Sequence, residues 1–205
     1  MTTIRAILFD MDGTLTVPYF DFEAIRRALG LPPKIRILDA IRALPPAESA
    51  RAMAELVRFE DDAADHAEWN PGAREILDWT RDRGLRRGIL TRNSRRSYER
   101  TSRKLGIAVD ASVAREDAPM KPRPESAWLL CERLGVRPEE CVLVGDYLYD
   151  IQCGQAAGTL TVLLTNGTPP KFEAKPDLTI HKLQELTGWL EERLGKGGPE
   201  QPTTN

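Results

Sequence analysis

The chain has 205 residues, of which 41% are hydrophobic and 29% are charged, and this composition is typical of a globular protein and indicates neither a largely disordered chain nor a fibrous repeat. Its 29 basic and 31 acidic residues give a formal net charge of −2, so no field of one sign would attract nucleic acid or an anionic membrane surface. No stretch approaches the roughly 18 consecutive apolar residues of a membrane helix. The first residues run into a strand pattern and not into a signal sequence, so we predict a cytoplasmic protein with three unpaired cysteines.

The chain begins with a predicted strand and then leaves that pattern for about fifty residues. Residues 4–10, IRAILFD, are strongly apolar and end in a polar residue, which is typical of a buried parallel strand. Residues 17–69 contain helical patterns and no convincing strand, and Pro71-Gly72 follows them as a turn signal. We therefore predict a small all-helical cap inserted after the first strand.

From residue 70 onward, predicted strands and helices alternate. Such alternation indicates βαβ units and a parallel sheet covered on both faces. The fold class expected is therefore α/β, Rossmann-like, with the core domain at 1–16 and 70–194, the helical cap at 17–69 and a disordered tail at 195–205. The further strands are predicted at 86–91, 141–146 and 159–165, and the helices at 73–83, 94–105 and 125–134.

Two aspartates lie close together at the end of the first predicted strand. Asp10 ends the strand, and Asp12 follows directly before Gly13-Thr14. Carboxylates this close repel each other unless a cation or a shared proton intervenes. Mg²⁺ prefers hard oxygen ligands and keeps positions open for water and phosphate, so we predict a magnesium site that includes Asp10 and Asp12.

Two more aspartates follow the strand predicted at 141–146. Asp146 and Asp150 are four residues apart, and on a helix or turn this spacing brings both carboxylates toward one ion. Both are therefore predicted metal ligands. Asp150 could instead cap a helix or lie on the surface.

Polar and basic residues between these aspartates are candidates for phosphate binding. Thr91, Arg92 and Asn93 follow the strand at 86–91, where a hydroxyl and neighbouring amides could hold phosphate oxygens. Thr91 could instead cap the next helix, and Asn93 or Ser94 could share that role. Lys121, between prolines in PMKPRPE, could balance the charge of Asp10 and of an incoming phosphate. A solvated helix face is expected for the remaining basic residues of this region, Arg95, Arg96, Arg100 and Arg103, whereas Arg92 remains a candidate because it adjoins Thr91.

Four separated motifs, in this order, resemble the haloacid dehalogenase superfamily, and more specifically its phosphoglycolate phosphatase-like branch with a small helical cap. The resemblance spans residues 4 to about 165. Tyr147 departs from the commonest pattern, which has Ser or Thr after the aspartate, and we expect this to change packing or loop shape but not the reaction. The motifs are carried by Asp10 with Asp12, by Thr91, by Lys121, and by Asp146 with Asp150.

The resemblance implies a reaction and a role for each motif. Asp10 would be the nucleophile, and Asp12 would protonate the leaving alcohol and later activate the water that hydrolyses an aspartyl phosphate. Lys121 would orient Asp10. The phosphoryl group would be bound by Thr91 and Asn93, and Mg²⁺ by Asp10, the backbone carbonyl of Asp12, Asp146 and, through water, Asp150.

The function expected is Mg²⁺-dependent hydrolysis of small phosphate monoesters, with a small phosphorylated metabolite as the partner and neither nucleic acid nor membrane. The alternative is a phosphomutase acting on a sugar phosphate, which the short cap disfavours. A dehalogenase also uses an aspartate nucleophile at a strand end, but it needs neither Asp12 nor magnesium, so the presence of Asp12 argues against it. A non-catalytic phosphate- or protein-binding module could lose catalytic residues, whereas this chain keeps all of them.

Overall fold

A six-stranded parallel sheet confirms the predicted α/β class. The computed structural model describes residues 3–194, so the predicted disordered tail at 195–205 lies outside the described residues. The strand order is β3-β2-β1-β4-β5-β6, which places β1 between β2 and β4. The strands are β1 (Ala6–Phe9), β2 (Arg86–Leu90), β3 (Ala111–Val113), β4 (Cys141–Gly145), β5 (Leu160–Leu164) and β6 (Leu178–Ile180).

The four longer strands occur where the sequence predicts them, and the two short edge strands do not follow from the sequence. β3 and β6 have three residues each, which is too short to show an apolar pattern. Their pairing with β2 and β5 defines them, for example Gly88 opposite Ala111 and Val162 opposite Leu178. Only the assembled sheet therefore reveals these two strands.

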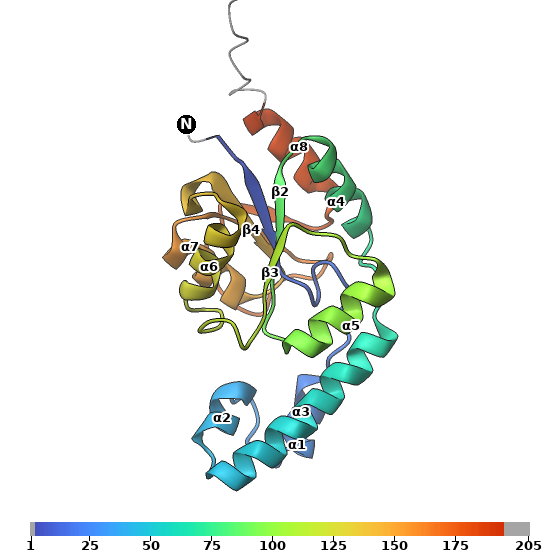
Figure 1. Cartoon of the computed structure of the whole chain (residues 1–205), viewed down its shortest axis with the longest axis vertical. Coiled ribbons are helices and arrows are strands. Elements are labelled where there is room, and N and C mark those ends of the chain that lie inside the picture. The colour runs from blue at the N-terminus through green and yellow to red at the C-terminus, as the bar shows by residue number, and fades with distance from the viewer. Residues whose placement is uncertain (1–2, 195–205) are drawn as a thin grey trace, which may run out of the picture. The chain divides into compact units, whose positions relative to one another are not determined.

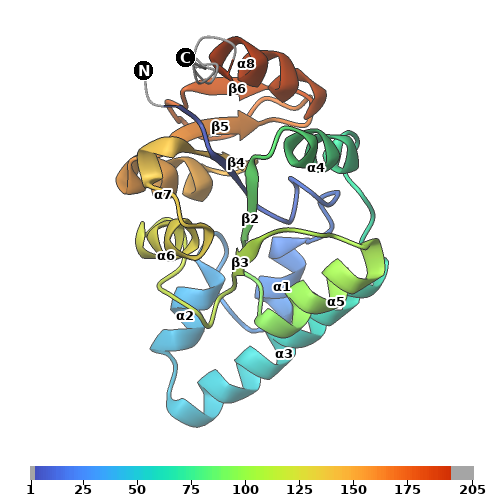
Figure 2. The same cartoon turned by 45° about the horizontal axis from the view of Figure 1, so that its top comes forward.

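Helices cover both faces of the sheet, as Figures 1 and 2 show. On one face, α6 (Glu125–Leu134) packs on β2 and β3, and α7 (Leu148–Ala157) packs on β4 and β5. On the other face, α4 (Ala73–Asp82) packs on β2 and on α8 (Gln184–Leu194). A short 3-10 helix (Pro138–Glu140) precedes β4. Among the described helices, none is both long enough and apolar enough to cross a lipid bilayer.

Four of the helices form a second compact unit, separate from the one that contains the sheet. The first unit comprises the described residues up to Val17, Trp69–Arg92 and those from Val109 onward, and the second comprises Pro18–Glu68 and Asn93–Ala108. The second unit adds α5 to the helices of the insertion, so the division predicted at 17–69 stays a prediction. Its helices are α1 (Phe22–Ala28), α2 (Ile37–Ala43), α3 (Pro46–His66) and α5 (Arg95–Leu105).

Charged side chains join α3 and α5, which lie side by side in Figure 1. Arg96 lies 2.7 Å from Asp61, and Arg100 pairs with Asp61 and Asp65. The side chains of Arg96 and Arg100 stay 68% and 38% exposed, so both lie on a solvated face as predicted, and acidic residues of α3 pair with them there. Ser94 caps α5 by accepting a hydrogen bond from the Ser97 N–H at 3.2 Å.

Candidate active site

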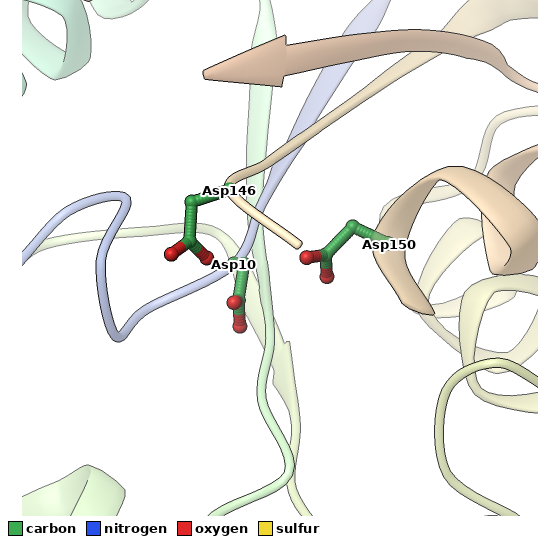
Figure 3. A group of neighbouring side chains, drawn as sticks. All are labelled: Asp10, Asp146 and Asp150. Carbon is green, nitrogen blue, oxygen red and sulfur yellow. The ribbon is translucent and has the colours of Figure 1, made fainter. Parts of the chain in front are cut away.

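Three aspartates meet at the carboxyl edge of the sheet, as Figure 3 shows. Asp10 follows β1, Asp146 follows β4 and Asp150 lies in the first turn of α7. The neighbouring strands fix this edge, because the Asp10 N–H donates to the carbonyl of Val144 at 2.9 Å. One carboxylate oxygen of each aspartate lies within 4.8 Å of the others, so the group could hold a metal ion.

Lys121 binds two of these carboxylates at once. Its Nζ lies 2.6 Å from Asp10 Oδ1 and 2.6 Å from Asp150 Oδ1, and its side chain is only 2% exposed. The loop that carries it lies between β3 and α6. Because one oxygen of Asp10 is held by the ammonium group, the orientation of the carboxylate is fixed.

The electrostatics of the group favour an additional cation. Burial, together with the charge of Asp150, raises the pKa of Asp10 to about 6 although Lys121 opposes the rise. Burial and the charges of Asp10 and Asp150 raise the pKa of Asp146 to about 8. Burial lowers the pKa of Lys121, but the two carboxylates outweigh it and the net shift is upward. Three hard oxygen donors with excess negative charge fit Mg²⁺, since a divalent ion would favour their ionised forms.

These shifts predict that metal-free protein loses stability as the pH rises from about 5 to 8. In the folded state Asp10 keeps its proton up to about pH 6 and Asp146 up to about pH 8, whereas both are ionised at these pH values in the unfolded chain. Unfolding therefore becomes more favourable as the pH rises. Mg²⁺ should raise the melting temperature most at the upper end of the window. The measurement is the melting temperature against pH, with Mg²⁺ and with chelator.

The matched variant for this measurement is Asp146→Asn, which cannot ionise. We expect it to flatten the metal-free profile and to remove most of the Mg²⁺ effect. A wild-type profile that falls no more steeply than that of the variant would contradict the prediction.

A network of amides holds the loop that follows Asp10. Asn70 donates to the carbonyl of Thr14 at 2.9 Å and to Asn166 Oδ1 at 3.0 Å, and Asn166 donates to the carbonyl of Gly13 at 2.7 Å. Asn70 is buried, so these bonds replace water that its amide would otherwise need. Segments far apart in the sequence therefore fix the position of the loop beside the nucleophile candidate.

Gly13 is required in this loop for two reasons. Its φ is +78°, and a Cβ atom there would lie 2.2 Å from Asp146 Oδ2. Gly13→Ala should therefore displace the Asp146 carboxylate and lower the Mg²⁺-dependent turnover expected from the sequence by about 100-fold, because a shift of about 1 Å has an effect of that size. Gly84→Ala is the matched control, because it introduces the backbone strain without the clash. Gly84 has a φ of +66°, and a Cβ atom there would have nothing within 4 Å. Gly84→Ala should lose roughly 1 kcal/mol of unfolding free energy and Gly13→Ala at least as much, and equal turnover in the two would contradict the prediction.

Asp150 combines the two roles that its sequence position allowed. Its Oδ2 accepts a hydrogen bond from the Tyr147 N–H at 3.1 Å, which caps α7, and its Oδ1 binds Lys121. Gly145 makes room for it, since a Cβ atom at that position would lie 2.2 Å from the Asp150 carboxyl carbon. Capping thus orients the carboxylate toward the site.

The phosphate-binding candidates after β2 are divided between the two units. Thr91 is buried, and its N–H donates to the carbonyl of Val113 at 3.0 Å. Arg92 is partly buried, with its guanidinium carbon 4.7 Å from the centre of the Tyr149 ring. Asn93 is buried and begins the segment that belongs to the second unit. Since Ser94 caps α5, capping is not the role of Thr91 or Asn93.

Asp12 differs from the other predicted metal ligands. It is partly buried, and its backbone forms a bridge with Thr16. Among the described residues, the group of carboxylates that could share an ion consists of Asp10, Asp146 and Asp150, without Asp12. A contribution of the Asp12 backbone carbonyl to the metal stays a prediction.

Sequence reasoning missed three residues at this edge. Asn70 and Asn166 were visible only as parts of turn signals beside Pro71-Gly72 and Gly167, and nothing in the pattern linked them to the loop after Asp10. Tyr149 lies inside the GDYLYDI motif, but its contact with Arg92 joins segments that are 57 residues apart. No local signal could have revealed these contacts.

Comparison with known proteins gives concordant results. A family model described as haloacid dehalogenase-like hydrolase matches residues 4–158. A haloacid dehalogenase-like hydrolase domain-containing protein of Arabidopsis thaliana is 31% identical, over 93% of this chain and 85% of that protein. A phosphoglycolate phosphatase of Chromobacterium violaceum is 30% identical, over 89% of this chain and 95% of the enzyme. The crystal structure of a hydrolase from Pseudomonas syringae, 20% identical, superposes with a TM-score of 0.78 over 92% of this chain and 98% of its own.

Proposed function

Because the chain belongs to the haloacid dehalogenase-like hydrolase family, we propose that it is a magnesium-dependent phosphatase that hydrolyses small phosphate monoesters through an aspartyl-phosphate intermediate. The observation that carries this proposal is the position of Lys121, which binds Asp10 and Asp150 at the carboxyl edge of the sheet. An ammonium group that fixes one oxygen of Asp10 leaves the other oxygen available for attack on phosphorus.

The residues that would hold Mg²⁺ are Asp10, Asp146 and Asp150, with the backbone carbonyl of Asp12. The bound ion would shield the carboxylate nucleophile from an anionic substrate and stabilise charge on the equatorial phosphoryl oxygens. The raised pKa values of Asp10 and Asp146 support this assignment, since both carboxyls need a cation to ionise fully near neutral pH.

In the first step, the free oxygen of Asp10 attacks phosphorus in line with the leaving oxygen. A bond forms between the Asp10 carboxylate and phosphorus, and the ester bond breaks. Asp12 gives its proton to the leaving oxygen, so the alcohol departs neutral. Thr91, Arg92 and Asn93 offer a hydroxyl, a guanidinium and an amide to the anionic substrate.

In the second step, water hydrolyses the aspartyl phosphate. Asp12, now ionised, takes a proton from the water while its oxygen bonds to phosphorus. The bond between phosphorus and the Asp10 oxygen breaks, which restores the carboxylate and releases inorganic phosphate. Lys121 offsets negative charge on Asp10 in both steps.

The substrate class proposed is a small phosphorylated metabolite. One relative is a phosphoglycolate phosphatase, and phosphoglycolate is therefore an appropriate first substrate to test.

The three cysteines are buried free thiols, in keeping with the predicted cytoplasmic location, which stays a prediction.

The experiment that tests this function is release of inorganic phosphate from a panel of phosphorylated metabolites, with Mg²⁺ and with chelator. Turnover that requires Mg²⁺ would support the proposal. No turnover of any ester by folded, Mg²⁺-loaded protein would contradict it. Isomerisation of a sugar phosphate in the presence of a bisphosphate would favour the phosphomutase alternative instead.

A further inference from the structure

Arg92 and Tyr149 form a contact across the end of the strand that carries Asp10. Arg92 follows β2, and Tyr149 lies in the first turn of α7, the helix that follows β4. In the sheet, β1 lies between β2 and β4. Neighbouring strands are about 4.8 Å apart, so β2 and β4 are separated by roughly 10 Å. The Arg92 guanidinium carbon nevertheless lies 4.7 Å from the centre of the Tyr149 ring. The two side chains must therefore span the carboxyl end of β1, where Asp10 lies.

The contact between Arg92 and Tyr149 lies nearer the protein surface than the contacts of Lys121 do. The side chains of Lys121 and Asp150 are each 2% exposed, whereas Arg92 and Tyr149 are only partly buried. In an in-line displacement by Asp10, the leaving oxygen points away from the nucleophile. A side chain that crosses the edge further out than Lys121 is therefore placed beside the leaving group.

The guanidinium of Arg92 has no anionic partner among residues 3–194. Its only described interaction is the stacking on Tyr149, and its Nε is buried without a hydrogen-bond acceptor. This distinguishes it from Arg96 and Arg100, which pair with carboxylates of α3. Stacking on a ring leaves the N–H groups at the edge of the guanidinium plane available to an acceptor. A buried donor without an acceptor is costly, and an anionic ligand would remove that cost.

We propose that Arg92, held in place by Tyr149, is a specificity-determining residue that binds an anionic group on the leaving portion of the substrate. The substrate class is then phosphate monoesters that carry a carboxylate or a second phosphate, and this inference rests on the phosphatase function proposed above. Tyr149 is a positioning residue. Its ring contacts that of Tyr147 at 5.1 Å between centroids, and Tyr147 in turn contacts Phe172 at 5.1 Å, so an aromatic row supports it.

Matched pairs of esters test this specificity. 3-Phosphoglycerate and glycerol 3-phosphate differ by a carboxylate in place of a hydroxymethyl group, and propane-1,3-diol bisphosphate and its monophosphate differ by a second phosphate. For wild-type enzyme we expect kcat/KM to be at least about 10-fold higher for the anionic member of one pair or both, as expected for one charge-assisted hydrogen bond. The pair with the larger ratio identifies the anion.

Substitutions of Arg92 and Tyr149 test whether these two residues cause the preference for the anionic ester. Arg92→Gln should lower kcat/KM for the preferred anionic ester by about 30-fold and for its neutral partner by no more than about 3-fold. Tyr149→Leu should reduce the preference by about 3-fold through a higher KM, and Tyr149→Phe, which keeps the ring, should restore it. A purely structural role of Tyr149 would lower kcat for both esters alike.

Two outcomes would overturn the inference: equal kcat/KM for both members of each pair in wild-type enzyme, or an equal loss for both members in Arg92→Gln. The second would assign Arg92 to the transferring phosphoryl group. Binding of the same esters to Asp10→Asn, measured by calorimetry with Mg²⁺, gives a readout without turnover. If no ester is hydrolysed, the phosphatase function fails, while weaker binding of only the anionic esters in Asp10→Asn/Arg92→Gln would still support the role of Arg92.

Discussion

Asp10→Asn is expected to abolish phosphate release, with a loss of at least about 10⁴-fold in kcat. The amide cannot attack phosphorus as a carboxylate does, and Asp10 is the carboxylate that Lys121 holds at the end of β1. The measurement is phosphate release under saturating Mg²⁺ with the best ester of the panel. The fold should survive, because the amide is nearly the same size as the carboxylate.

Stability gives a second readout for this variant. Since burial and Asp150 raise the pKa of Asp10 to about 6, its ionised form destabilises the metal-free folded state above that pH. We expect Asp10→Asn to melt no lower than wild type at pH 8 in chelator. Asp39→Asn is the matched control, because Asp39 is a half-exposed carboxylate of α2 that pairs with Arg36 at the start of this helix. Activity of Asp10→Asn within 10-fold of that control would refute the nucleophile assignment.

Lys121→Met is expected to lower both stability and activity. The ammonium group is the only cation that the structure shows in contact with Asp10 and Asp150, and its removal leaves buried carboxylates without a partner. The loss of unfolding free energy should be about 3 kcal/mol at pH 8 without metal. Turnover should fall by about 100-fold or more, because Asp10 is no longer oriented. Urea unfolding and phosphate release measure the two effects.

The pH dependence of the stability of Lys121→Met tests whether the lost charge of Lys121 causes the destabilisation. At pH 5 the carboxylates of Asp10 and Asp146 take up protons, so the destabilisation should shrink, and at pH 8 Mg²⁺ should restore part of the stability by supplying positive charge. Lys182→Met is the control, since Lys182 is exposed and its side chain makes no ion pair in the described structure. A loss that is the same at both pH values and with Mg²⁺ would point to packing and not to charge.

The sequence by itself determined the fold class and the candidate chemistry. Apolar runs that end in polar residues predicted β1, β2, β4 and β5, because parallel strands are buried on both faces and expose their ends at one edge. The same strand ends carried Asp10 and Asp146, so local order placed both carboxylates at the site. These elements can be predicted because each signal lies within seven or fewer consecutive residues, and the geometry of a strand is set over that length of chain.

Only the tertiary structure decided how distant segments complete the site. The salt bridges from Lys121 to Asp10 and Asp150, the amide network of Asn70 and Asn166, and the stacking of Arg92 on Tyr149 all join residues that are 29 or more positions apart. The edge strands β3 and β6 and the placement of α5 in the second unit are likewise products of pairing and packing. Such contacts depend on strand order and on burial, which no local pattern of apolar and polar residues encodes.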